Sequence, residues 1–91
     1  DLKPSNTPAL TNLAFAYMHL GNSEAALSSA RAAVHIESGN AQAHFVIGLV
    51  MFINHGPVDE VRHELELAAP TLPAARRTLD WIKTGKLVST R

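Results

Sequence analysis

The 91-residue sequence predicts an all-α fold of five short antiparallel helices. No segment alternates apolar and polar residues as a half-buried strand does, and the segments between turn signals consist mostly of good helix formers such as Ala, Leu, Glu and Arg. The turn signals leave only short loops, which connect antiparallel helix neighbours. An internal repeat of about 34 residues is the third observation.

The first helix is expected to begin at Thr7-Pro8, an N-cap residue followed by proline at the first helical position. Gly21 is expected to end it, because glycine readily adopts the left-handed conformation that closes helices. Ser23 is the expected N-cap of the second helix, which runs to about Glu37 before another glycine.

Asn40 is the expected cap of a third helix, which ends near Asn54 at the break His55-Gly56-Pro57. A fourth helix is expected over residues 57–69, since a proline follows it. A fifth is expected over residues 73–85, between a proline and a glycine.

The internal repeat has an offset of 34 residues in its first half and 35 in its second. The first copy is Leu10, Leu13, Ala14, Tyr17, Gly21, Ala26, Ala30, Ala33 and Ser38, and the second is His44, Ile47, Gly48, Met51, Gly56, Val61, Leu65, Ala68 and Pro73. We assign the extra residue to the turn at residues 55–57, where an insertion costs little.

Small residues at these positions allow two helix axes to approach closely. They are Ala14, Gly48, Ala26, Ala30 and Ala33. Larger residues are expected to fill the space between the helices, namely Leu10, Leu13, Tyr17 and Leu27. A single helix hairpin cannot bury its apolar face alone, so successive copies are expected to stack.

The pattern resembles the tetratricopeptide repeat family over nearly the whole chain. The resemblance implies helix-turn-helix repeats stacked as a right-handed α-solenoid. Residues 1–6 would end a preceding repeat, 7–40 and 41–73 would form two repeats, 74–85 a C-terminal capping helix, and 86–91 a basic tail. We therefore expect a larger parent protein that continues upstream.

In that family the first helix of each repeat lines a concave groove that binds peptides or proteins. The resemblance implies a partner-binding groove formed by Thr11, Asn12, Phe15, Met18, His19, Gln42, Phe45, Val46, Leu49, Phe52, Ile53, Arg77 and Trp81. Thr11, Phe15 and Val46 stand where some members carry a clamp for a terminal carboxylate, so an apolar or amphipathic segment is the expected ligand. The chain is predicted to be a non-enzymatic interaction scaffold.

Other interpretations remain open for the third helix, in which nine of the eleven residues 43–53 are apolar. Apolarity on all sides indicates burial within the chain, a docking surface, or homo-oligomerisation of this piece of the protein. The run is too short to span a membrane. An RNA-binding repeat is disfavoured, because Phe45, Leu49 and Phe52 are not polar readers; no nucleic-acid partner is predicted.

Charge divides the chain, with a net −4 over residues 1–72 and +4 over residues 73–91. A solvated terminal helix and tail explains this asymmetry, as does a docking face. Lys83 stands where Ala14 and Gly48 are small, which indicates that no further helix packs closely on the fifth one. Trp81 is expected either to pack over the end of the groove or to anchor a partner.

The chain lacks the motifs of an enzyme, a metal site or a cofactor site. It has no cysteine, no Gly-rich phosphate loop and no nucleophile–base motif. No two of the five histidines His19, His35, His44, His55 and His63 lie at helical ligand spacing. We interpret His44 as a half-buried packing residue, and His19 as a groove residue or a solvated helix end. The acidic residues Asp59, Glu60, Glu64 and Glu66 are expected to form a solvated helix face.

Overall fold

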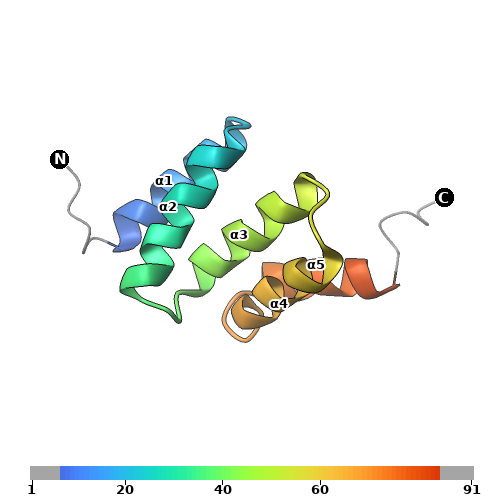
Figure 1. The fold of residues 1–91 in the computed structure, drawn as a ribbon. Coiled ribbons are helices and arrows are strands. Elements are labelled where there is room, and N and C mark those ends of the chain that lie inside the picture. Colours follow the sequence, from blue (N-terminus) through green and yellow to red (C-terminus); the bar gives the residue numbers. More distant parts are fainter. Residues whose placement is uncertain (1–6, 85–91) are drawn as a thin grey trace.

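The computed structural model describes residues 7–84, and within them the chain forms five α-helices and no strand (Figure 1). The helices are α1 Thr7–His19, α2 Ser23–Ile36, α3 Ala41–Ile53, α4 Val58–Ala68 and α5 Pro73–Thr84. The predicted all-α class is confirmed, and the expected helix boundaries hold to within about two residues. The expected preceding repeat, the basic tail and the helix end at Gly85 lie outside the described residues.

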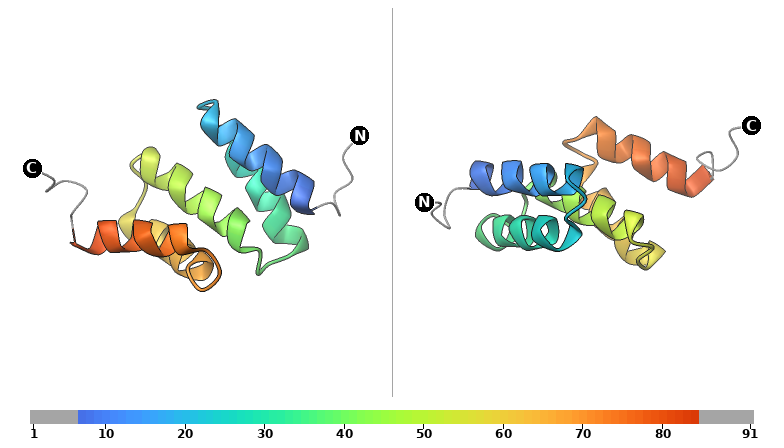
Figure 2. Two further views of the ribbon diagram at one scale, coloured as in Figure 1. Left: turned by 180° about the vertical axis from the view of Figure 1, so that it is seen from behind. Right: turned by 90° about the horizontal axis from the view of Figure 1, so that it is seen from above.

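Helix α3 lies at the centre of the molecule. Each helix packs against the next in the chain, and α1 also contacts α3. Figure 1 shows α1 and α2 on one side of α3, with α4 and α5 on the other. In the view from above (Figure 2, right), α1 and α5 lie towards one face and α2 towards the opposite one. The central helix is therefore the element on which the two helix pairs meet.

Asn22, and not the predicted Ser23, is the N-cap of α2. Its backbone is non-helical, and its side chain accepts a hydrogen bond of 3.1 Å from the backbone N–H of Ala25. Ser23 is already the first helical residue. The side chain of Asn22 reaches the free N–H groups of the first turn, which satisfies one of them. The predicted cap at Asn40 is confirmed, since its side chain accepts a 2.8 Å hydrogen bond from Ala43 N–H.

The turn after α3 repeats the turn after α1 at an offset of 34 residues. Gly21 has φ of +81°, and His55, 34 positions later, has φ of +62°. The N–H of Asn22 donates to the carbonyl of Tyr17, and the N–H of Gly56 donates to that of Met51. Both hydrogen bonds close the helix in the manner of a Schellman motif.

His55 is thus the structural counterpart of Gly21, and the predicted match between Gly21 and Gly56 is wrong by one residue. The extra residue of the second copy is Pro57, which follows the closing turn and precedes the start of α4 at Val58. Matching the two copies by sequence paired one glycine with another. In the structure, the residue of the second turn that has the positive φ of Gly21 is a histidine.

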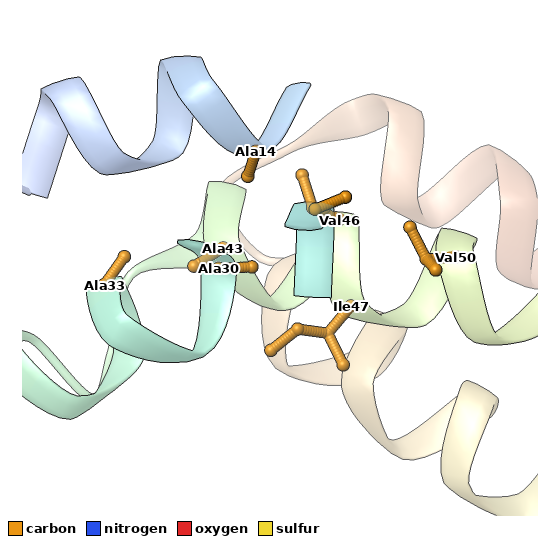
Figure 3. Packing of buried hydrophobic residues seen from close by; sticks show 8 residues of the cluster. Ala14, Ala30, Ala33, Ala43, Val46, Ile47 and Val50 are labelled. Carbon is orange, nitrogen blue, oxygen red and sulfur yellow. The ribbon is translucent and has the colours of Figure 1, made fainter. Parts of the chain in front are cut away.

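Four alanines of α1 and α2 belong to the core cluster that these helices share with α3. Ala14, Ala26, Ala30 and Ala33 are all fully buried, and Figure 3 shows three of them converging with side chains of α3. Leu10, Tyr17 and Leu27 are only partly buried and pack around this centre, whereas Leu13, which the sequence assigned to the same role, is half-buried and does not belong to the cluster. The small side chains bring the helix backbones close, and the larger ones close the edges.

The second helix pair uses a different combination of sizes at the same positions. A Cβ atom on Gly48 would lie 3.0 Å from Cγ and Cδ2 of Leu65, which is fully buried in α4. The equivalent residues of the first pair are Ala14 and Ala30. A larger residue on α4 is therefore accommodated by the absence of a side chain on α3.

Helix α5 packs its apolar face against α4. Ala75 is fully buried, Leu79 is buried, and Ile82 packs against the same cluster as Val61 and Leu65. Lys83 is exposed, as its position in the repeat predicted. The apolar face of this amphipathic helix thus attaches α5 to the rest of the molecule.

Replacing Gly48 by Ala is expected to lower the unfolding free energy by about 0.5–2 kcal/mol, although alanine is the better helix former. The reason is that Leu65 is enclosed on all sides and cannot move away from the new methyl group. In a Leu65→Ala background the same substitution is expected to stabilise by about 0.5–1 kcal/mol. Urea denaturation of the four proteins measures this coupling, and additive effects would contradict the close crossing.

Replacing His55 by Gly is expected to stabilise the chain by about 0.5–1 kcal/mol, because glycine adopts a positive φ without steric cost. The matched change Gly21→Ala introduces a Cβ atom at the same place in the first turn and is expected to destabilise by about 1 kcal/mol. Thermal denaturation followed by circular dichroism checks both. Equal signs for the two changes would show that the turns are not equivalent.

Candidate protein-interaction surface

The two helices α1 and α3 carry no Asp, Glu, Lys or Arg at all. Their histidines are their only ionisable side chains apart from Tyr17. We define the first-helix surface as the accessible side chains of α1, α3 and α5 that the sequence assigned to the groove: Asn12, Phe15, Met18, His19, Gln42, Phe45, Leu49, Phe52, Ile53, Arg77 and Trp81. Most of this surface is uncharged and apolar.

Phe15 and Phe45 join α1 to α3 on this surface. Their ring centroids lie 6.4 Å apart and the ring planes are tilted by 52°. Both rings are half-buried, and Phe45 also packs against the cluster shared by α4 and α5. Such tilted aromatic pairs contribute stability beyond simple burial. The structure therefore brings together predicted groove residues from α1 and α3.

The remaining groove residues of α3 differ in exposure along the helix. Gln42 is exposed, Leu49 and Phe52 are half-buried, and Ile53 remains 58% exposed at the end of the helix. On α1, Asn12 is exposed and Met18 is half-buried against the first core cluster. The side of α3 that carries Leu49, Phe52 and Ile53 is incompletely covered by the described chain.

Thr11 and Val46 do not belong to an accessible surface. Thr11 is 1% exposed, and its hydroxyl donates a 2.9 Å hydrogen bond to the carbonyl of Pro8 in its own helix. Val46 is fully buried in the core between α1, α2 and α3. The prediction that these two residues contact a partner is wrong, because the close approach of the helices encloses them.

His19 ends α1 and faces solvent. Its Nδ1 lies 2.8 Å from the backbone carbonyl of Phe15, one turn earlier in the helix. Histidine near a helix C-terminus commonly satisfies a carbonyl in this way. This contact favours the second of the two sequence interpretations, in which His19 is a solvated helix end.

Arg77 and Trp81 lie on the exposed side of α5. With Ala74 and Thr78 they line a shallow pocket of about 260 Å³ that involves α5 alone. Trp81 is 49% exposed. The structure thus places these two predicted groove residues beside each other, in a pocket separate from the contact between Phe15 and Phe45.

His44 is the buried polar residue that sequence reasoning assigned to packing alone. It is 7% exposed, its Nδ1 lies 2.7 Å from Oε1 of Glu64, and its Nε2 lies 2.7 Å from the carbonyl oxygen of Ser38. A ring with protons on both nitrogens donates to both acceptors. His44 therefore links α3 to α4 and to the loop before α3.

Because Glu64 contacts His44, it does not belong to the solvated helix face to which the sequence assigned it. Its side chain is 23% exposed, whereas Asp59, Glu60 and Glu66 are exposed as expected. No spacing rule would pair residues 20 positions apart on different helices. The available signal was a polar residue, His44, at the position that corresponds to Leu10 in the first copy.

A pocket between α2 and α4 was also missed. It has a volume of about 440 Å³, and α3 forms its floor with Ile47 and Met51. Glu60 and Glu64 of α4 line one wall, and Arg31 of α2 lines the other. We call it the α2–α4 pocket.

Within residues 7–84 no three His, Asp or Glu side chains are grouped so that they could hold a metal ion. None of the helices in this part of the chain has the length and apolarity needed to cross a membrane. Comparisons with family models, with curated proteins and with solved structures found no match.

Replacing Glu64 by Ala is expected to lower the unfolding free energy by about 1–3 kcal/mol, because buried His44 loses a hydrogen-bond partner. Glu64→Gln is expected to cost less than half as much, since the amide still bonds to the ring. Glu66→Ala on the same helix is the matched control, with an expected effect within about 0.5 kcal/mol. Urea denaturation measures all three, and equal losses for Glu64→Ala and Glu66→Ala would show that the contact contributes nothing.

Proposed function

We propose that the chain is a protein-interaction scaffold built from tetratricopeptide-like helix pairs. In this proposal the pairs α1–α2 and α3–α4 are successive repeats of a right-handed α-solenoid, and α5 is its cap. The inner face is the first-helix surface. Two features support the repeat: the small residues at both helix crossings, and the identical closing turns 34 residues apart.

The single observation that carries the binding role is the incompletely covered apolar side of α3. Leu49 and Phe52 are half-buried and Ile53 is mostly exposed, on a helix without any Asp, Glu, Lys or Arg. Exposed apolar groups gathered on one surface favour a site of protein interaction. The aromatic pair of Phe15 and Phe45 extends this apolar surface to α1.

The chemistry of this surface favours an apolar or amphipathic protein segment as the partner. Such a segment can enter as a helix laid into a groove or as an extended chain. Trp81 with Arg77 at the far end offers an aromatic and a charged contact, the residue types enriched in interface hot spots. The proposal includes no catalytic residue and no cofactor.

A variant with Leu49→Glu and Ile53→Glu is expected to bind apolar peptides at least tenfold more weakly. A loss of this order is typical when one buried hot-spot residue of an interface is removed. Peptides are first selected against the unaltered chain from a random display library, and the affinities are then measured by fluorescence anisotropy. The reason for the loss is that two carboxylates would be buried beneath the apolar ligand without partners.

Leu67→Glu is the matched control, because Leu67 is 45% exposed on α4 and lies outside the first-helix surface. The control is expected to bind within about twofold of the unaltered chain, as distant surface changes do. Circular dichroism must show that both variants are helical. Selected peptides that bind the α3 variant as tightly as the unaltered chain would contradict the proposal.

A further inference from the structure

We propose that the contact of His44 with Glu64 and Ser38 is a proton-dependent latch, which is closed near neutral pH and is released as the pH rises. Three parts of the chain meet at this ring, since His44 belongs to α3, Glu64 to α4 and Ser38 to the loop before α3. The latch concerns the packing of α4 on α3, so it does not depend on the groove proposed above.

The geometry of the contact determines how many protons it needs. A backbone carbonyl only accepts hydrogen bonds, so Nε2 of His44, which lies 2.7 Å from the carbonyl oxygen of Ser38, carries a proton. Nδ1 lies 2.7 Å from Oε1 of Glu64, where a neutral ring would turn a lone pair towards a carboxylate oxygen. A second proton therefore lies between the two side chains, bonded either to the ring or to the carboxyl group.

The surroundings of the pair make this second proton necessary. His44 is only 7% exposed and the side chain of Glu64 is 23% exposed, so water weakens a repulsion between them only in part. The helices also cross closely here, because a Cβ atom on Gly48 would lie 3.3 Å from Cβ of Glu64. Loss of the proton thus leaves two facing lone pairs between backbones that are held together by packing.

The α2–α4 pocket gives the released carboxylate a place to move. Both His44 and Glu64 line this pocket, whose volume is about 440 Å³. Rotation about the side-chain bonds of Glu64 can carry the carboxylate away from the ring and into the pocket, which Arg31 of α2 also lines. The open state of the latch then keeps the helices but lacks the hydrogen bond between His44 and Glu64.

The other ionisable groups around the ring are exposed. They come from α2, from α4 and from the loop before α3, whereas α3 itself carries no Asp, Glu, Lys or Arg. These groups are Arg31, Glu37, Asp59, Glu60 and His63. Charges in contact with water are strongly screened. The two direct contacts of the ring therefore decide whether the second proton is held.

The direction of the pH effect follows from the proton count. In the unfolded chain both side chains are solvated, and an ordinary imidazole loses its second proton near about pH 6.5. Above this pH the folded chain with a closed latch binds one proton more than the unfolded chain. For one such proton, the folding equilibrium constant falls by up to about tenfold per pH unit as the pH rises. The stabilisation is fully present below about pH 6.5 and is lost at higher pH.

The variant Glu64→Gln separates the proton from the shape of the contact. The amide has nearly the size of the carboxylate, but its NH₂ group donates to Nδ1 of a neutral ring, so the contact needs no extra proton. The unfolding equilibrium constants of this variant and of the unaltered chain are measured by urea denaturation between about pH 6 and about pH 9. Their ratio, variant over unaltered chain, is expected to fall by about tenfold across this range.

His63→Gln is the matched control, because His63 is exposed on the same helix as Glu64 and lines the same pocket. The ratio of its unfolding constant to that of the unaltered chain is expected to change by less than about twofold over the same range. NMR of the isotope-labelled, unaltered chain shows where the proton lies. At about pH 7.5 we expect either an imidazolium at His44 or a protonated Glu64, and a neutral ring at His63.

Three results would overturn the proposal. The first is a ratio for Glu64→Gln that does not change with pH. The second is an equal pH dependence for His63→Gln, which would assign the effect to an exposed histidine. The third is a neutral His44 ring beside an ionised Glu64 at about pH 6. This last measurement needs only the unaltered chain, so it decides the question even where a variant is unstable.

Discussion

The structure depends on how closely its helices approach, and the smallest side chains decide that distance. At equivalent positions of the two crossings, α1 and α2 carry the fully buried Ala14 and Ala30, and α3 and α4 carry Gly48 facing Leu65. Protein interiors pack at near-crystalline density, so one methyl group more or less at such a crossing is felt. The pairing of Gly48 with Leu65 shows that the second crossing accepts a large side chain on one helix where the other helix has no side chain.

Close approach has a consequence for polar groups, because it excludes water from the faces that meet. Helix α3 contacts α1, α2 and α4, and it accordingly carries no Asp, Glu, Lys or Arg. The polar group enclosed there, His44, is satisfied by two oxygen acceptors. Burying such a ring without partners would cost free energy, so Glu64 and the Ser38 carbonyl are part of the packing solution at this crossing.

Sequence reasoning succeeded where a feature is local or periodic. The end of α1 at Gly21, the N-cap of α3 at Asn40 and the small residues of the crossings all follow from nearby or periodic residues. It failed where the environment of a residue depends on how the helices pack against one another. Whether Thr11 or Val46 reaches solvent depends on how far α3 approaches its neighbours, and the contact of His44 with Glu64 joins residues that no sequence period relates. The positive-φ residue of the second turn was assigned to Gly56, because glycine is the usual signal of such a turn, whereas the structure has His55 there.

The distribution of charge follows from the same geometry and separates two surfaces. The central helix α3 is enclosed by its neighbours and, apart from Gln42 near its start, exposes apolar side chains such as Ile53. The second helices α2 and α4 turn one side outward, where carboxylates such as that of Glu60 are well solvated. A pocket between the second helices therefore combines an apolar floor from α3 with acidic walls from α4. The apolar floor follows from the absence of charged residues on α3, and the acidic groups follow from the outward side of α4.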